Sequence, residues 1–290
     1  MRGRGDPWRH RQTRVQVGGR PLALHWVTGG ALAEPPLILI HGMLSSWRQW
    51  RGTMARLGGE LPLAAVDLPG FGASGLSHRK MEVRQFADAC EEWCRLQGWP
   101  ALAVIGHSFG GAVLLDWISR YPERFRTIGL MAPGAIFHPW YTSGYQFLRW
   151  PVVGRLMAPA VIWAVSTHTL GRRQFAHLVA DIGQVEPDEE EDLRWGARRA
   201  REMLRALEYY RFPTLERDLP RVRQPVFLAW GTGDRVVPVE DAAFFRAHLP
   251  DCRATFWEGV GHLPFVERRA NVDDWIRSVW AEHRGLATVQ

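Results

Sequence analysis

The chain has 290 residues, of which 46% are hydrophobic and 23% are charged, proportions typical of a globular protein rather than a disordered or fibrous one. A chain of this length is long for one simple domain and short for two, so we expect one core domain with an insertion. The formal net charge is +6, but the arginines are scattered among acidic residues and no RNP-like, helix-turn-helix or zinc-finger pattern occurs. Nucleic-acid binding is therefore not expected.

The three cysteines argue against a disulfide framework, and Cys90 and Cys94 have the spacing of small buried residues on one face of a helix. No further ligands lie near them in the sequence, so no metal site is expected. The N-terminus lacks the apolar run of a signal peptide, and the most apolar segment, 150–165, contains Arg155 and two prolines. We expect a cytoplasmic protein without stable membrane insertion, and the sequence leaves its oligomeric state open.

The first expected elements in chain order are a basic tail over residues 1–14 and a β-hairpin. The hairpin is predicted from RVQVGGRPLALHWV (14–27), in which polar and apolar residues alternate on both sides of Gly18 and Gly19. Short apolar runs that each end in a loop come next, and continuous runs of this kind are typical of parallel strands covered on both faces. These runs are PLILIHG (36–42), LPLAAVDLPG (61–70), ALAVIGHS (101–108), TIGLMAP (127–133), PVFLAWGTGD (225–234) and ATFWEGVGH (254–262).

Amphipathic stretches alternate with the apolar runs. Two of them repeat apolar residues at helical spacing. These residues are Phe86, Cys90, Trp93 and Cys94 in one stretch, and Val272, Trp275, Ile276, Val279 and Trp280 in the other. A hairpin followed by alternating strands and helices predicts an α/β fold, with a mostly parallel central sheet flanked by helices.

The alternation breaks once, between about His138 and Leu215, where helical patterns occur without a convincing strand. The segment is too long for a connecting loop, so we expect a helical lid over 138–215, inserted into a core formed by 15–137 and 216–290. Within it, the acidic run EPDEEED (186–192) precedes several arginines, an order that suits a helix dipole. We expect this run to be the solvated start of a helix.

The residues that follow each strand matter most, because ligands of open α/β sheets bind outside the carboxyl ends of the strands. Ser108 occupies such a position in Gly-His-Ser-Phe-Gly (106–110), between a predicted strand and a predicted helix. A serine there sits on a sharp turn with its hydroxyl exposed, as a nucleophile requires. The short pattern alone is equally compatible with a plain strand-to-helix turn capped by serine.

A serine nucleophile needs an imidazole base, and the imidazole needs a carboxylate to orient it. His262 follows the last predicted strand, and Asp234 follows the strand before it. Each residue alone has a simpler interpretation, as a loop histidine or a turn-forming aspartate. Their joint occurrence after Ser108 predicts a Ser108–His262–Asp234 triad, whereas Asp67, beside a glycine-rich loop, is interpreted as structural.

Two backbone amides are candidates for an oxyanion hole. The N–H of Phe109 begins the helix after Ser108, and the N–H of Met43 follows the His-Gly turn at the end of a central strand. We interpret His41 as a residue that stabilises this turn rather than as a base.

Taken together, these segments resemble the α/β-hydrolase family, of the type with a single His-Gly turn and a helical lid. The matching segments span nearly the whole chain from residue 15; they are LILIHGM, DLPGFGAS, VIGHSFGGAV, YPERFRTIGLMAP, GTGDRVVP and GVGHLPFVE. Some relatives take the acid from the strand before the lid, but MAPGAIF has no carboxylate, which favours Asp234. Dehalogenases and epoxide hydrolases of the family carry aspartate where this chain has Ser108. The GPG of ring-cleavage carbon–carbon bond hydrolases and the HGGG of another esterase branch are both missing.

The function expected from these residues is hydrolysis of carboxylic esters through an acyl-enzyme, as in a carboxylesterase, with no metal or cofactor. The partner would be a small-molecule ester with a small to medium apolar acyl group. Residues expected to contact it are Leu44, Trp140, Tyr141, Phe147, Trp163 and Leu263. Two alternatives stay open. One is a lactonase, perhydrolase-like enzyme or carbon–carbon bond hydrolase with the same triad, and the other is a non-catalytic protein that binds a small molecule.

Overall fold

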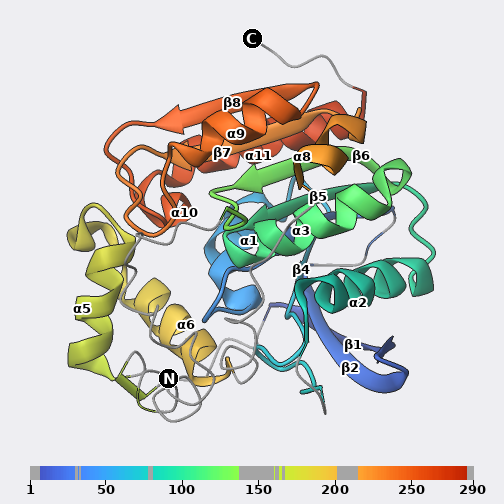
Figure 1. The fold of residues 1–290 in the computed structure, drawn as a ribbon. Coiled ribbons are helices and arrows are strands. Elements are labelled where there is room, and N and C mark those ends of the chain that lie inside the picture. Colours follow the sequence, from blue (N-terminus) through green and yellow to red (C-terminus); the bar gives the residue numbers. More distant parts are fainter. Residues whose placement is uncertain are drawn as a thin grey trace.

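A computed structural model of the chain describes residues 7–29, 32, 34–77, 81–136, 160, 163–164, 167–200 and 215–285. Its centre is an eight-stranded sheet with the order β1-β2-β4-β3-β5-β6-β7-β8 (Figure 1). The strands are β1 (Arg9–Val17), β2 (Arg20–Thr28), β3 (Leu37–Ile40), β4 (Leu63–Val66), β5 (Leu102–His107), β6 (Phe125–Met131), β7 (Val226–Gly231) and β8 (Cys252–Trp257).

Helices occupy the connections that follow β3, β4, β5, β6 and β7, and further helices follow β8. The longer ones are α1 (Arg51–Leu57), α2 (Val83–Leu96), α3 (Phe109–Arg120), α5 (His168–Leu178), α6 (Pro187–Arg198), α9 (Asp241–His248) and α11 (Arg269–His283). Short helices are η1 (Trp47–Trp50), η2 (Pro122–Arg124), η4 (Ile182–Gln184), α8 (Leu215–Asp218), η5 (Leu219–Arg221) and α10 (Pro264–Glu267). The two apolar patterns found in the sequence form α2 and α11, and their apolar residues are buried as expected.

The six strands β3 to β8 are parallel to one another. The hairpin β1–β2 joins them through an antiparallel pairing of β2 with β4. The expected α/β fold with a mostly parallel sheet is thus confirmed. One boundary was wrong: β1 begins at Arg9, inside the predicted tail, and Arg9 pairs with Thr28. Residues 9–12 are exposed on both faces of the strand, so no alternation of polar and apolar residues marks them in the sequence.

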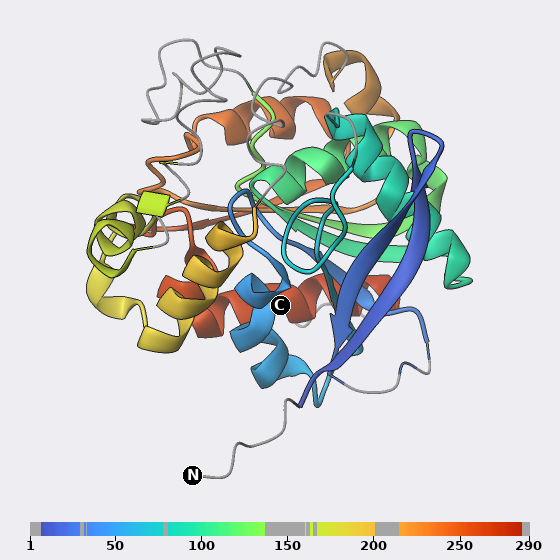
Figure 2. The ribbon, with the colours of Figure 1, turned by 90° about the horizontal axis from the view of Figure 1, so that it is seen from below.

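Two apolar layers cover the sheet, one on each face. Ile38 and Ile40 of β3 point into the layer that holds α2, α3 and α9, whereas Leu37 and Leu39 point into the layer that holds α1 and α11. Figure 2 shows α1 and α11 together on one side of the sheet and α2 with α3 on the other. This alternation is what a strand buried on both faces requires.

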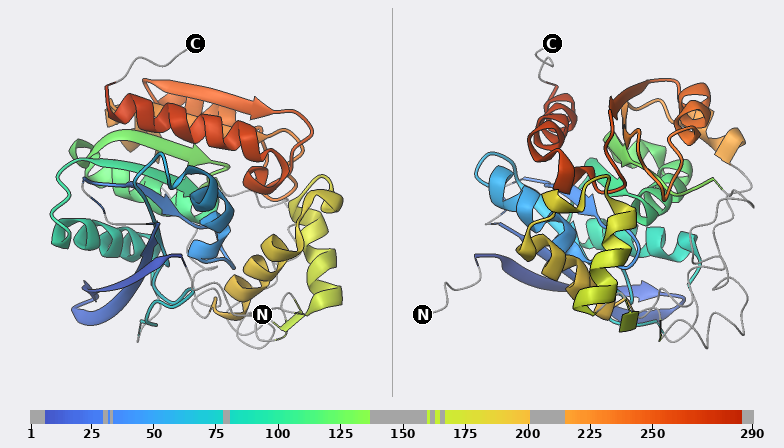
Figure 3. Two further views of the ribbon diagram at one scale, coloured as in Figure 1. Left: turned by 180° about the vertical axis from the view of Figure 1, so that it is seen from behind. Right: turned by 90° about the vertical axis from the view of Figure 1, so that its left-hand side faces the viewer.

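The segment between β6 and β7 contributes α5, η4 and α6, and its described residues form no strand. The helices α5 and α6 lie beyond one edge of the core, next to α10 (Figure 3). The proposed lid boundaries, 138 and 215, are not tested, and Trp140, Tyr141 and Phe147 lie outside the described residues. Trp163 is described and is 64% exposed.

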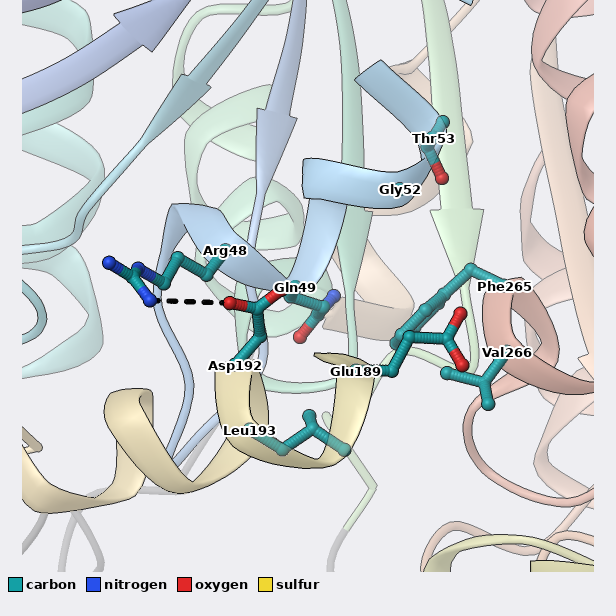
Figure 4. Close-up of a pocket in the computed structure, with 9 residues that line it drawn as sticks. All are labelled: Arg48, Gln49, Gly52, Thr53, Glu189, Asp192, Leu193, Phe265 and Val266. Atoms are coloured by element: carbon teal, nitrogen blue, oxygen red, sulfur yellow. Dashed lines mark hydrogen bonds and ion pairs between the residues drawn. The ribbon is translucent and has the colours of Figure 1, made fainter. Parts of the chain in front are cut away.

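The acidic run opens α6 as expected but is solvated only in part, with the side chains of Glu186 and Asp188 exposed. Pro187 begins the helix and acidic residues fill its first turn, but Glu190 and Asp192 are only 2% and 6% exposed. The carboxylate of Asp192 pairs with Arg48 of η1 at 3.3 Å (Figure 4). It also pairs with Arg51 of α1 at 2.6 Å. Burial raises the pKa of Asp192, and the two arginines oppose that rise. The acidic face of α6 therefore docks on the core, a role that helix periodicity does not reveal.

Within the described ranges, we find no helix that is long and apolar enough to cross a membrane.

Candidate active site

Ser108 lies in the turn between β5 and α3 and has a strained backbone, with φ 52° and ψ −114°. The turn is possible because two neighbouring glycines allow close approach. A Cβ on Gly106 would lie 2.5 Å from the carbonyl oxygen of Gly110, and a Cβ on Gly110 would lie 2.6 Å from that of His41. The Gly-x-Ser-x-Gly pattern thus packs β5, α3 and β3 together and leaves the serine at the carboxyl end of the sheet.

His262 and Asp234 lie beside Ser108 in the structure. The Nε2 atom of His262 is 2.9 Å from Ser108 Oγ, and its Nδ1 is 2.7 Å from Asp234 Oδ2. The other carboxylate oxygen of Asp234 accepts the backbone N–H groups of Val236 and Val237 at 2.8 and 2.9 Å. With Nδ1–H donating to Asp234, the Nε2 lone pair of His262 is left to accept the proton of Ser108.

The loop that carries His262 is held by the end of α5. The backbone N–H of His262 donates to the carbonyl of Leu178 at 2.7 Å. The buried carboxylate of Glu267 accepts the N–H of Gly261 at 2.8 Å and that of Ala180 at 2.7 Å. The segment between β6 and β7 therefore contributes directly to the position of the imidazole.

The turn that carries Met43 is stabilised by His41, as predicted. The Nδ1–H of His41 donates to the carbonyl of Gly42 at 2.7 Å, and its Nε2 accepts the N–H of Leu68 at 3.1 Å. Burial lowers the pKa of His41, so its ring is neutral in this arrangement. The Gly42–Met43 peptide is trans, so the N–H of Met43 points away from this bond, and no described residue accepts it.

The remaining candidate residues have varied surroundings. Phe109 is fully buried at the start of α3, directly after Ser108. Leu44, at φ 57°, is half-buried and packs against both apolar layers, whereas Leu263 is only 3% exposed and belongs to the layer around α11. Asp67 is structural, as interpreted from the sequence: its carboxylate accepts the N–H of Trp47 at 2.7 Å and contacts His25 Nδ1 at 2.7 Å.

Besides Glu267, two buried side chains at the site were not singled out from the sequence. His107 occupies the variable position before Ser108, and its Nε2 lies 2.9 Å from the carbonyl oxygen of His262. Gln49 of η1 lies 3.2 Å from His107 Nδ1 through its amide nitrogen. The glutamine stands in SSWRQW (45–50), where nothing in the pattern distinguishes it, and only the fold brings it to the strand ends.

The arrangement combines an accessible hydroxyl, a base within hydrogen-bond reach and a buried carboxylate behind the base. This combination can deprotonate the serine hydroxyl as it attacks an electrophilic carbon. Among the described residues, no group of three or more His, Cys, Asp or Glu side chains could hold a metal ion.

Comparison with known proteins identifies the family to which the chain belongs. The model of the alpha/beta hydrolase family matches residues 37–275. The chain is 28% identical over 264 residues to the magnesium-chelatase 30 kDa subunit of Rhodobacter capsulatus, covering 89% of this chain and 90% of that protein. It is 27% identical over 247 residues to the pimeloyl-[acyl-carrier protein] methyl ester esterase of Aeromonas hydrophila subsp. hydrophila, covering 80% of this chain and 90% of the esterase.

Among solved structures, naproxen esterase (carboxylesterase NP) from Bacillus subtilis has the same fold. It matches with a TM-score of 0.75 at 20% identity, covering 93% of this chain and 91% of that one. The family model spans most of the chain, from β3 into α11, and includes the elements that carry Ser108, Asp234 and His262. The chain therefore belongs to the α/β hydrolase family.

Proposed function

We propose that the protein is a serine carboxylesterase that hydrolyses esters through an acyl-enzyme. The hydrogen-bonded line from Ser108 Oγ through His262 to Asp234 is the observation that carries the proposal. Ser108 attacks the acyl carbon while His262 accepts its proton, and His262 then returns that proton to the leaving alcohol. Asp234 keeps Nδ1 protonated and stabilises the imidazolium. Water, activated by the same histidine, releases the acid and regenerates Ser108.

The backbone N–H groups of Met43 and Phe109 would stabilise the oxyanion of each tetrahedral intermediate. Support comes from the trans peptide fixed by His41 at Met43 and from the position of Phe109 at the start of α3, where the helix dipole favours negative charge. Loss of one such donor typically lowers kcat by about 100- to 1000-fold.

The substrate class proposed is a small to medium apolar acyl ester, with Leu44 and Leu263 near the acyl group. The expected contacts from Trp140, Tyr141, Phe147 and Trp163 belong to the same proposal, with 138–215 acting as a lid. Relatives support the ester linkage, since the similar Aeromonas protein is a methyl ester esterase and the similar Bacillus structure is a naproxen esterase.

The test is a p-nitrophenyl ester series with acyl chains of increasing length, measured on wild type and on Ser108→Ala. We expect hydrolysis of the shorter esters by wild type and a loss of at least about 10,000-fold in kcat for the variant, as for other serine triads. Equal rates for the two proteins on every ester would overturn the proposal.

Two further substrate groups address the alternatives. Turnover of lactones or of vinylogous diketones at rates well above those of the esters would assign the same triad to a lactonase or a carbon–carbon bond hydrolase. Tight binding of a small ligand without turnover of any substrate would instead favour the non-catalytic alternative.

A further inference from the structure

Gln49 connects two parts of the site that lie far apart in the sequence. Its side-chain oxygen accepts the backbone N–H of Gly42 at 3.0 Å, one residue before Met43. Its amide nitrogen lies 3.2 Å from Nδ1 of His107, one residue before Ser108. Both contacts are buried, so neither is weakened by exchange with bulk water.

The hydrogen-bond directions along this connection are determined by its two ends. The carbonyl of His262 can only accept, so His107 must donate to it from Nε2 at 2.9 Å. Because burial lowers the pKa of His107 well below its usual range, the ring is neutral and its Nδ1 is an acceptor. Gln49 therefore donates to Nδ1 with its amide group and accepts from Gly42 with its oxygen, which uses both halves of the amide.

Packing reinforces the same connection. The rings of His107 and His262 lie 4.8 Å apart, and Phe265 of α10 packs edge-on against His107 at 5.2 Å. Gln49 and Phe265 line one small pocket, which α6 closes with Leu193 among its residues (Figure 4). The amide of Gln49 is thus held at both ends, with its oxygen bonded to Gly42 and its nitrogen to His107.

We propose that Gln49 is a positioning residue that holds the Met43 turn directly, and the His262 loop through His107, in register around Ser108. Gln49 itself touches no reacting atom. It orients the Gly42 peptide, which precedes the proposed oxyanion donor Met43. It also orients the ring of His107, which in turn holds the backbone carbonyl of His262. Small displacements of such groups have large kinetic effects, of about 100-fold for 1 Å. This inference rests on the function proposed above, because it assigns Gln49 a part in the same reaction.

The test begins with Gln49→Met, which keeps the side-chain volume and removes both hydrogen-bonding groups. We expect kcat on the preferred p-nitrophenyl ester to fall about 10- to 100-fold with KM changed less than about twofold, since the lost alignment matters most in the transition state. His107→Phe keeps an aromatic ring against Phe265 but has no ring nitrogen. It breaks the same connection from the other end, and it carries the test if Gln49→Met does not fold.

The double variant separates a shared pathway from two independent effects. If Gln49 acts through His107, the kcat of the double variant is no more than about threefold below that of the less active single variant. A loss close to the product of the two single effects would overturn the proposal.

Met54→Ala is the matched control, because Met54 is buried in the adjoining helix α1 and is not part of the hydrogen-bonded connection. It is expected to lower the melting temperature while leaving kcat of the folded enzyme unchanged. If Gln49→Met lowers kcat no more than this control does, Gln49 is only structural and the proposal fails.

Labelling of Ser108 by a fluorophosphonate distinguishes this failure from that of the proposed function. If wild type hydrolyses no ester but is labelled at least 10 times faster than Gln49→Met, the ester proposal fails and the positioning role stands. If wild type hydrolyses esters and Gln49→Met matches it in both assays, the positioning role fails alone. Absence of both hydrolysis and labelling in wild type would overturn both.

Discussion

At the scale of single residues, the site combines a strained serine backbone with two buried, neutral histidines. Ser108 has φ 52°, a region that residues with a side chain rarely adopt, and it is held there by β5 on one side and α3 on the other. His41 and His107 are both buried, and burial lowers the pKa of each. Each neutral ring then has one donor and one acceptor, and each is used by a specific backbone or side-chain partner.

The strain at Ser108 predicts a difference in stability between two variants at this position. Ser108→Gly should be more stable than Ser108→Ala by about 1 kcal/mol. Glycine relieves about 1 to 3 kcal/mol of backbone strain, and its greater freedom in the unfolded chain offsets about 0.5 to 1 kcal/mol of that. Urea unfolding of both variants at one pH measures the difference, and an alanine variant as stable as the glycine variant would contradict a strained turn.

At the scale of elements, the segment between β6 and β7 is attached to the core by backbone approach as well as by charge. Gly261 lies so close to the end of α5 that a Cβ there would meet Val179 Cα at 2.7 Å. Gly196 of α6 lies equally close to the loop after the Met43 turn, where a Cβ would meet Ser45 Cα at 2.8 Å. Through these contacts α5 adjoins the loop that carries His262, and α6 adjoins the loop that follows Met43.

Gly196→Ala should therefore push α6 away from Ser45. We expect a loss of about 1 to 2 kcal/mol in unfolding free energy, because overpacking costs about 1 to 3 kcal/mol and the better helix propensity of alanine recovers up to about 1. Activity should fall as well, since the displaced loop follows Met43 directly.

Gly59→Ala is the control for this substitution, because a Cβ on Gly59 would meet nothing within 4 Å. Its stability should be unchanged or slightly higher. Denaturant unfolding and ester hydrolysis are measured on both variants. Equal unfolding free energies and equal rates for the two would mean that α6 does not affect the loop that contains Ser45.

At the scale of the whole molecule, the parallel sheet assembles the site, because β3, β5, β7 and β8 end at one edge. The same assembly buries His41 and His107 without charge, which makes overall stability depend on pH. A histidine whose pKa is lowered on folding binds more protons in the unfolded chain than in the folded one. Its contribution is complete above the usual pKa of about 6.5 and is lost as the pH falls below that value.

Unfolding free energy should accordingly decrease between pH 6.5 and pH 5, and His107→Phe should flatten that decrease. Each neutral buried histidine contributes up to about 1.4 kcal/mol per pH unit in this range, so the slope difference between wild type and variant should approach that figure. Urea unfolding at several pH values measures both slopes. Parallel slopes for the two proteins would show that His107 takes up a proton in the folded state.

The sequence by itself determined the fold class and the identity of the residues at the strand ends. Apolar runs covered on both faces, with Gly-His-Ser-Phe-Gly after one of them and Asp234 and His262 after two others, are local signals. Strand and turn chemistry makes such signals readable without coordinates. The role of His41 in its turn was readable for the same reason, because its partners are neighbours along the chain or across one strand pair.

Only the tertiary structure decided which other side chains complete the site. Gln49, His107 and Glu267 act through partners that are 7, 58, 155 or 87 residues away, and no periodicity records such distances. The burial of Asp192 in α6 was not predictable for the same reason: a helix dipole explains acids at the helix start, but contact with Arg48 and Arg51 depends on where the helix docks. Local sequence specifies elements and turns, whereas hydrogen bonds between distant segments arise only when the strand ends meet.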